Sequence, residues 1–332
     1  MADIAITTEL QEIQNNLWGT NVRENIALAL EKLQNLPEEP NTIQGSLKNS
    51  KLSLLKVSIQ NMENTLQSRK DQLDRIKARL EQASGRTILQ YGKCGNDVYY
   101  TICDDGEAAL YGTGATYDYT SHDSVFYQND QIKEIVLSNG ITGLGDRLFY
   151  HCANAKTVSL PATLTSIGDF AFAQKDAVIN DTAGLTSVTI PQAVTAMQSH
   201  AFYYTAIAEV TVPASVKTWG KYAFSGCAKL KTARVACDSI GAFAFTRCTA
   251  LSNLTISANC KTFGENMLTY CERLKTITYE GTIAQWNAIT KPVNWMSSGE
   301  HSYNNYLKKI QCVDGYLEYD TETHTWNEVK NG

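Results

Sequence analysis

One sequence pattern recurs seven times between Ile135 and Tyr279, and it constrains the fold more than any other feature of the chain. Its fullest form runs from Val210 to Leu230 as V-T-V-P-A-S-V-K-T-W-G-K-Y-A-F-S-G-C-A-K-L. The copies open with apolar triplets that begin at Ile135, Val158, Val188, Val210, Ala233, Leu254 and Ile277. The intervals are 23, 30, 22, 23, 21 and 23 residues. A period near 23 predicts a solenoid, whose turns bury their apolar faces only against one another.

Two further columns of residues keep this register. An aromatic position follows the strands by 12 to 14 residues and ends in a leucine: Phe149, Phe172, Phe202, Phe224, Phe245 and Leu268. Glycines mark the corner before it at Gly145, Gly168, Gly220, Gly241 and Gly264, whereas the remaining turn has Gln198. We expect each turn to contain a short strand, a tight corner that needs a residue without a Cβ atom, and a brief helical or irregular segment. The strands should form one parallel sheet along the solenoid.

Four of the nine cysteines occupy one repeat position, three residues after the aromatic one: Cys152, Cys227, Cys248 and Cys271. No C-x-x-C pair favours zinc, so we interpret these four as small buried apolar residues. Cys94 and Cys103 remain open as a disulfide pair across a hairpin.

The first 85 residues follow a helical period instead. Apolar spacing predicts two short helices over residues 10–33, separated at Trp18-Gly19. A third segment has seam residues spaced alternately three and four apart: Leu52, Leu55, Ile59, Met62, Leu66, Arg69, Leu73, Ile76 and Leu80. This seam predicts a coiled coil that self-associates through these residues. The alternative is a monomeric bundle in which this helix folds back on the first two.

These patterns together predict an α+β fold in five segments. We expect a helical attachment segment at residues 1–40, a coiled-coil stalk at 41–85, a β-hairpin cap at 86–130, the solenoid at 131–281 with seven strand turns, and a C-terminal cap and hairpin at 282–332. The first hairpin should turn at Asp104-Asp105-Gly106 and the last near Asp320.

Composition and residue spacing exclude several classes of function. The net charge of −5 over 332 residues leaves no basic stripe for nucleic acid. No apolar run reaches the roughly 18 residues of a membrane helix, and Met-Ala-Asp-Ile lacks the order of a secretory signal, so we expect a chain without membrane contact that is kept in a cytosol. The five histidines show no spacing that suggests a triad or a metal site: His122, His151, His200, His301 and His324. Asp104, Asp105 and Asp146 lie near predicted turns, where aspartate is ordinary. We therefore expect no enzyme, no cofactor and no metal.

If the function is binding, two sets of side chains are candidates. The middle residues of the strands should face solvent and form a polar ladder: Ser159, Thr189, Thr211, Arg234, Thr255 and Thr278. A solvated strand face alone explains such threonines. The second set consists of aromatic residues outside the core positions: Tyr203, Tyr204, Tyr222, Tyr270, Trp295, Tyr303 and Tyr306. Such rings stack on sugars and anchor interfaces, although several must pack the solenoid ends. We take this second set, with Thr211 and Arg234, as receptor-binding candidates.

The segment G-K-C-G-N-D-V-Y-Y-T-I, the repeats that follow it, and Y-E-G-T-I-A-Q-W-N-A-I after the last repeat resemble bacterial BspA-like leucine-rich repeat proteins. The resemblance covers about residues 91–312 and implies a capped leucine-rich repeat solenoid. It also implies a C-terminal cap formed by Tyr279, Gly281, Thr282, Trp286 and Ile289. The chain departs from the family at Gln198 and at an insertion between Lys175 and Gly184.

The opening E-L-Q-E-I-Q-N-N-L-W-G-T-N-V-R-E-N-I-A-L-A-L-E-K-L is similar to that of receptor-binding and baseplate-attached tail proteins of phages that infect Gram-positive bacteria. This similarity implies attachment to phage baseplate or tail proteins through Leu10, Ile13, Leu17, Trp18, Val22, Arg23 and Ile26. It also implies a homotrimeric fibre, located in the virion tail and assembled in the host cytoplasm. We therefore expect a phage receptor-binding protein whose repeat head binds a glycan or protein of the host surface. A bacterial surface or secreted leucine-rich repeat adhesin and a glycan-degrading tail enzyme are the alternatives.

Overall fold

The computed structural model describes residues 85–120, 123–174, 183–296, 306–320, 322, 323 and 325–331, together with part of residues 53–82. The chain divides into two compact units, Met1–Ile88 and Leu89–Gly332. In the first unit, every described residue between 53 and 82 is helical. Of the predicted seam, Ile59 is described and is partly buried, whereas the other seam residues and all seven attachment residues lie outside the described residues. The coiled coil and the trimer stay predictions.

The second unit begins with three strands, β1 (Ile88–Lys93), β2 (Gly95–Cys103) and β3 (Glu107–Thr116). Strands β2 and β3 form an antiparallel hairpin at the turn that the sequence indicated. Beyond it, β3 pairs in parallel with both β4 (Glu134–Leu137) and β5 (Ile141–Leu144). A single long strand therefore starts two faces of the solenoid and covers the open end of its core.

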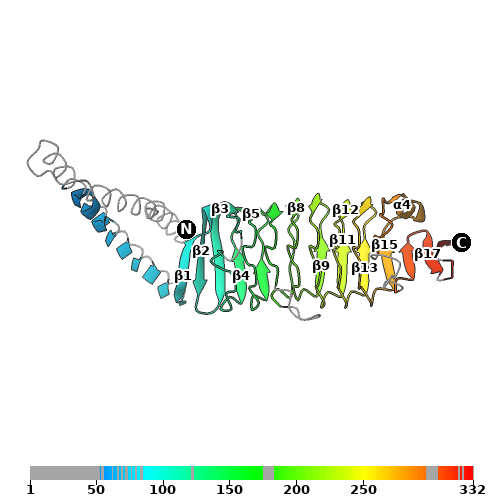
Figure 1. Cartoon of the computed structure of the whole chain (residues 1–332), viewed down its shortest axis with the longest axis horizontal. Coiled ribbons are helices and arrows are strands. Elements are labelled where there is room, and N and C mark those ends of the chain that lie inside the picture. The colour runs from blue at the N-terminus through cyan, green and yellow to red at the C-terminus, as the bar shows by residue number, and fades with distance from the viewer. Residues whose placement is uncertain are drawn as a thin grey trace, which may run out of the picture. The chain divides into compact units, whose positions relative to one another are not determined.

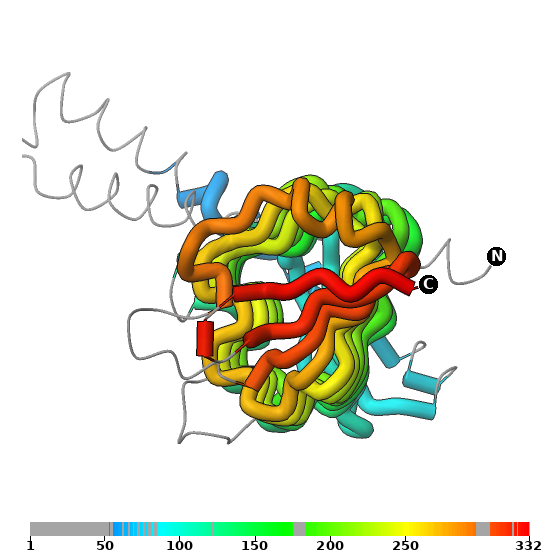
Figure 2. The backbone as a smooth tube through the Cα atoms, turned by 90° about the vertical axis from the view of Figure 1, so that its right-hand side faces the viewer, coloured from blue at the N-terminus to red at the C-terminus, as the bar shows by residue number. Residues whose placement is uncertain are grey.

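The solenoid has two strand-bearing faces, where the sequence analysis expected a single parallel sheet (Figure 1). One face holds β4, β6 (Thr157–Ser159), β9 (Glu209–Val212), β11 (Thr232–Val235), β13 (Asn253–Ile256) and β15 (Thr276–Tyr279). The other holds β5, β7 (Ser166–Ile167), β8 (Ala196–Met197), β10 (Thr218–Trp219), β12 (Ser239–Ile240) and β14 (Thr262–Phe263). Seen along the stack, successive turns superimpose (Figure 2). Turns of nearly equal length can repeat their backbone hydrogen bonds rung after rung.

Six of the seven predicted strands form, and the segment that starts at Val188 does not. Val188 and Ile190 are still buried in the core. Two residues before Val188 the backbone still bonds to both neighbouring turns, since Thr186 N donates to Lys156 O and Ala208 N donates to Thr186 O, at the position where the regular turns make the same bonds. The insertion directly before this turn explains the difference, because the extra residues break the regular pairing while the apolar side chains keep their register.

A column of phenylalanine rings forms the centre of the core. Neighbouring rings from Phe149 to Phe245 lie 5.1 to 5.9 Å apart, with their planes within 12° of parallel. Phe126, which the repeat pattern did not include, adds one more ring at 4.7 Å from Phe149. All six rings are fully buried. Burial of side chains of this size is the dominant contribution to the stability of such a stack.

The cysteines of the repeat column are buried free thiols, as predicted. Each Sγ donates to the backbone carbonyl of the core ring one turn earlier: Cys152 to Phe126 at 3.0 Å, and Cys227, Cys248 and Cys271 to Phe202, Phe224 and Phe245 at 3.2 Å. Cys94 and Cys103 are also buried, and neither forms a disulfide, so the hairpin disulfide that the sequence left open is absent.

The corner glycines are required for a reason that differs from the predicted tight bend. At Gly220 a Cβ atom would lie 2.2 Å from the backbone nitrogen of Ser199, and at Gly264 it would lie 2.2 Å from that of Ala242. Neither glycine has a positive φ. The small residue is needed because the backbone of the preceding turn passes directly over it, and no flexible side chain could move aside.

The C-terminal end is covered by α4 (Ile283–Ala288), β16 (Lys309–Cys312) and a hairpin of β17 (Gly315–Asp320) and β18 (Thr325–Lys330). Thr282 and Gln285 form a capping box that starts α4. The ring of Trp286 meets that of Tyr279 edge-on at 5.3 Å. Strand β16 extends the face of β15 in parallel, and the hairpin turns after Asp320, as the sequence indicated.

Candidate binding site

The polar ladder lies on the solvent side of the β9 to β15 face. Thr211 pairs in register with Arg234, which pairs with Thr255. Two guanidinium nitrogens of Arg234 donate to the carboxylate of Glu280, the shorter bond being 2.7 Å. The charge of Arg234 is therefore offset within the protein.

The aromatic candidates separate into buried and exposed residues. Tyr204 is 3% exposed and Trp295 is 7% exposed, so the prediction that these two rings contact a ligand is wrong. Trp295 instead packs against Phe263 in the C-terminal cap, with ring centroids 5.3 Å apart. Tyr306 is exposed and its ring lies 4.4 Å from the Lys275 ammonium. Tyr303 lies outside the described residues.

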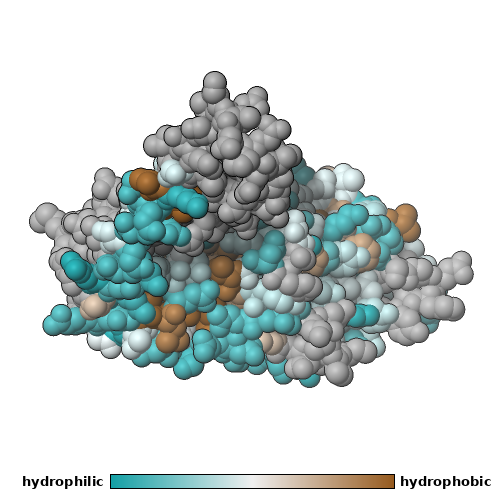
Figure 3. All heavy atoms as spheres, turned by 60° about the vertical axis from the view of Figure 1, so that its left-hand side comes forward, coloured by the Kyte–Doolittle hydropathy of each residue, from teal (hydrophilic) through white to brown (hydrophobic). Residues whose placement is uncertain are grey.

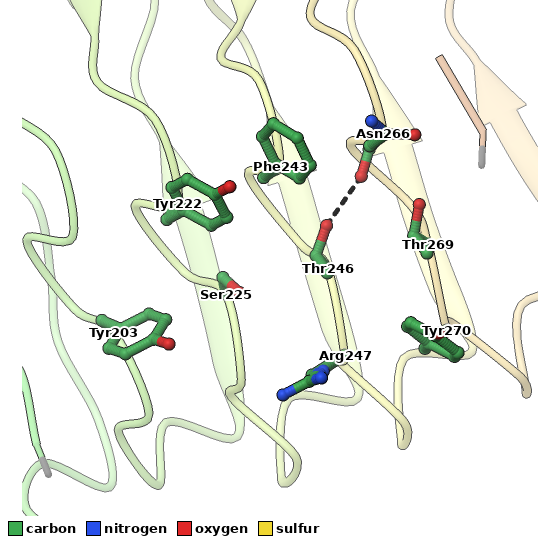
Figure 4. A pocket seen from close by; sticks show the side chains of 9 residues that line it. All are labelled: Tyr203, Tyr222, Ser225, Phe243, Thr246, Arg247, Asn266, Thr269 and Tyr270. Carbon is green, nitrogen blue, oxygen red and sulfur yellow. Dashed lines mark hydrogen bonds between the residues drawn. The ribbon is translucent and has the colours of Figure 1, made fainter. Parts of the chain in front are cut away.

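The remaining three candidates, Tyr203, Tyr222 and Tyr270, line one pocket with a volume of about 210 Å³. Its other lining residues, which the sequence analysis did not select, are Ser225, Phe243, Thr246, Arg247, Asn266 and Thr269. These nine side chains, here called the aromatic pocket, lie in three rows across consecutive turns (Figure 4). The middle row runs from Tyr203 through Ser225 and Thr246 to Thr269, and its last three residues are buried and form the floor. The other two rows form the walls.

One wall is set by an unusual backbone conformation. Tyr222, Phe243 and Asn266 have φ values of 61°, 58° and 53°, and each lies two residues before a core side chain. This left-handed region is uncommon for residues other than glycine. Hydrogen bonds between turns hold it, since Tyr222 N donates to Ala242 O and Phe243 N donates to Glu265 O.

The same column forms a second ladder of rings, partly exposed and outside the core. Phe170, His200, Tyr222 and Phe243 stack with centroids 4.3, 4.9 and 4.5 Å apart. Burial between its neighbours lowers the pKa of His200. The column ends at the pocket, because the next turn has Asn266. The sequence carried this signal, since F-A-F, H-A-F, Y-A-F and F-A-F occur in four consecutive turns.

The opposite wall depends on Gly226, which has no side chain. A Cβ atom at Gly226, whose φ is +75°, would lie 2.5 Å from the ring of Tyr204. The ring of Tyr204 therefore occupies that space, and Arg247 Nη1 donates to its hydroxyl at 3.1 Å. The guanidinium carbon of Arg247 also lies 5.9 Å from the ring centroid of Tyr270. Arg247 is exposed and brings a positive charge to the rim.

The floor offers hydrogen-bond acceptors. Thr246 Oγ1 donates to Asn266 O at 2.7 Å, and Thr269 Oγ1 donates to Met296 O at 3.3 Å. Each hydroxyl oxygen keeps lone pairs for a ligand donor. Asn266 is only 5% exposed, and among the described residues its Oδ1 has no hydrogen-bond partner. A buried amide oxygen in this state retains unused capacity for a hydrogen bond.

Within the described ranges, no group of three His, Cys, Asp or Glu side chains could hold a metal ion. The described helices include none with the length and apolarity needed to span a bilayer. Among the coloured residues in Figure 3, hydrophilic ones dominate and hydrophobic ones form small, separate patches. The aromatic pocket combines rings with hydrogen-bonding groups.

Comparison with known proteins supports the repeat architecture. A family model described as the BspA type Leucine rich repeat region matches residues 120–180 and 175–290, in six copies. A leucine-rich repeat protein from Eubacterium ventriosum is 19% identical, covering 67% of this chain and 84% of that one with a TM-score of 0.34. One from Bacteroides ovatus is 16% identical, covering 66% and 76% with a TM-score of 0.36. The T. pallidum leucine-rich repeat protein is 23% identical, covering 56% and 87% with a TM-score of 0.38. No curated protein matches.

Proposed function

The chain belongs to the BspA-type leucine-rich repeat family, and on that basis we propose that it is a non-catalytic attachment protein whose repeat module binds a molecule on a cell surface. The aromatic pocket is the proposed contact. The observation that carries this proposal is the convergence of Tyr203, Tyr222 and Tyr270, from three different turns, on one hollow.

The scaffold suits such a role because it holds the pocket in one geometry. The walls come from turns that are joined by backbone hydrogen bonds, for example Gly226 N to Thr246 O at 2.8 Å and Arg247 N to Thr269 O at 2.8 Å. A preorganised site loses little conformational entropy when a ligand binds. Tyrosine rings add contact area at a low entropic penalty.

The state of the thiols supports a non-catalytic role. Burial raises the pKa of the Cys152, Cys227 and Cys271 thiols to about 12. Since the thiolate is the nucleophile, these groups are inert near neutral pH. A third reading, a glycan-degrading enzyme, would need a pair of acids, and the nine lining residues of the aromatic pocket contain no carboxylate.

We propose the phage tail as the setting of this attachment, with the solenoid as the head of a homotrimeric fibre. The support is the similarity of residues 9–33 to phage tail proteins and the helical conformation of the described residues between 53 and 82. In this setting the opening segment binds baseplate or tail proteins. A surface adhesin of a bacterium is the second candidate, favoured by membership of the BspA-type family.

A cell-binding measurement tests the attachment function. Fluorescently labelled full-length protein should bind intact Gram-positive cells of at least one species in a panel. The double variant Tyr203→Ala, Tyr270→Ala should lose most of this binding, whereas Thr232→Ala, at an exposed position of β11, should keep it. Binding that is equal for all three proteins would place the contact outside the aromatic pocket. Antibody labelling of phage particles from the same source distinguishes a phage tail fibre from a bacterial surface adhesin. A tail fibre requires the antibody to bind the phage tail.

A further inference from the structure

We propose that two copies of the chain pair through strand β18, with the two strands antiparallel and Val329 of one copy opposite Val329 of the other. Strand β18 is the last strand at the C-terminal end of the solenoid and is drawn in red in Figure 2. This interface does not involve the aromatic pocket, so it stands or falls independently of the proposed attachment function.

Strand β18 is an edge strand of its sheet. It pairs with β17 on one side and with no described strand on the other. Asn331 N donates to Asp314 O on the β17 side, so the alternation along the strand turns the backbone groups of Trp326, Glu328 and Lys330 outward. Among the described residues, none forms a backbone hydrogen bond with these outward groups. An edge of this kind can accept a further strand.

The sequence along this edge is self-complementary. It reads Asn327-Glu328-Val329-Lys330-Asn331, which is symmetric about Val329 except that the charges on the two sides are opposite. Antiparallel pairing reverses one copy relative to the other. A pair centred on Val329 therefore sets Glu328 of each copy against Lys330 of the other. In the same register the outward backbone groups of the two strands face each other.

Other registers are less favourable. A pair centred on Glu328 or on Lys330 opposes two like charges, which destabilises the contact between strands. A pair centred on Asn327 sets Glu328 against Trp326 and gains no charge pair. Charged side chains commonly protect an edge strand from pairing. Here their order along the strand selects one register for a second copy of the same strand.

The side chains at the edge can make these contacts. Asn287 Nδ2 donates to Glu328 Oε1 at 2.8 Å, which holds the carboxylate while its other oxygen can accept from an ammonium group. Lys330 is exposed and forms no ion pair with any described residue. Val329 is 38% exposed, and pairing would cover it with the same side chain of the other copy.

The pairing should be weak and should depend on concentration. A contact between two single strands is far smaller than the total area of about 1,600 Å² that a stable interface buries. In dilute protein the predicted stalk alone should therefore set the mass, and pairing through β18 should add to it as the concentration rises. Each pair brings two repeat modules, and hence two aromatic pockets, into one assembly.

Cross-linking of the full chain tests the contact. In the proposed register the Cα atoms of the two Val329 residues lie about 4.5 Å apart, which suits a disulfide. Val329→Cys should therefore form a covalent dimer under mild oxidation with diamide, seen at twice the chain mass on a non-reducing gel. The native cysteines are buried free thiols and should contribute little.

Val313→Cys is the matched control for this cross-link. Val313 is 62% exposed and lies just before β17, at the same end of the solenoid but outside β18. It should give much less dimer than Val329→Cys. Equal amounts of dimer in the two variants, or none in either, would refute a second copy as the occupant and leave the edge to a strand of another protein.

Charge variants test the register. Glu328→Lys alone and Lys330→Glu alone oppose like charges, so each should lower the association constant from concentration-dependent light scattering by about tenfold or more. A mixture of these two variants again sets opposite charges against each other and should associate as the wild-type chain does. Lys231→Glu makes the same charge change at an exposed position before β11 and should have no effect. A mixture that associates no better than either variant alone would overturn the proposal.

Discussion

Arg247 Nη1 donates to the hydroxyl of Tyr204 at 3.1 Å, although the two residues are 43 positions apart. They are separated by one complete turn, in which Gly226 occupies the equivalent position and leaves room for the ring of Tyr204. The wall of the aromatic pocket thus depends on a contact between turns that are not adjacent.

A double-mutant cycle should measure this contact. Tyr204→Phe keeps the buried ring but removes the hydroxyl, so we expect a loss of about 1 kcal/mol in the free energy of unfolding. Combination with Arg247→Ala should show a coupling energy of about 0.5–1.5 kcal/mol by urea unfolding. Thr211→Ala combined with Arg247→Ala serves as the control and should be additive. Additive behaviour of Tyr204 and Arg247 would show that the bond contributes nothing to stability.

The two ring ladders should differ in their contribution to stability. Phe202→Ala leaves a cavity in the fully buried column and should lower the free energy of unfolding by about 3–5 kcal/mol. Phe170→Ala, in the partly exposed outer ladder, should lower it by less than half as much. Chemical denaturation of both variants provides the comparison, and equal losses would contradict the assignment of the inner column as the core.

Gly220 and Gln198 occupy the same repeat position, so they form a matched pair. Gly220→Ala places a Cβ atom against the backbone of Ser199 and should lower the free energy of unfolding by about 1–3 kcal/mol. Gln198→Ala only shortens an exposed side chain and should change it by less than about 0.5 kcal/mol. If both variants unfold at the same denaturant concentration, the close approach of turns at Gly220 is not a constraint.

The protein should lose stability above about pH 9. Burial raises the pKa of Cys227 from 9.0 to about 12, so the unfolded chain releases a proton at a lower pH than the folded one. Stability is therefore fully present below pH 9 and falls as the pH rises from 9 toward 12. Thermal unfolding from pH 7 to 10.5 should show the fall, and Cys227→Ala should reduce its slope by about 1.4 kcal/mol per pH unit. A slope that does not change in this variant would refute the role of the thiol.

The proposed fibre is a homotrimer that associates through the seam. Light scattering should give three times the chain mass of 36.7 kDa. Leu66→Asp with Leu73→Asp puts charges into the seam and should yield a monomer, whereas Lys70→Asp, at an exposed helical position, should leave the trimer intact. A monomeric mass for the wild-type chain would contradict the predicted coiled-coil stalk.

Much of the solenoid could be predicted from the sequence, because equivalent residues in each copy of the repeat have the same packing and the same backbone hydrogen bonds. The core position of Phe202 and its equivalents, the buried cysteine column, both hairpin turns and six of the seven strands follow from a 23-residue period and from local turn chemistry. The segment at Val188 differed because strand assignment depends on the pairing of neighbouring turns, which the insertion before it disturbs. Of the aromatic candidates, three line the pocket, and Tyr204 and Trp295 are buried.

The sequence by itself determined the register, which assigns side chains to the inside or the outside of each turn, because that depends only on spacing along the chain. Only the tertiary structure decided which residues come together in the aromatic pocket. The space left by Gly226, the reach of Arg247 to Tyr204 and the end of the outer ladder at Asn266 are relations between different turns. Stacking brings these residues together across sequence separations of 22 residues for Gly226 and Tyr204, 43 for Arg247 and Tyr204, and 23 for Phe243 and Asn266, which are too long for local sequence to specify the contacts.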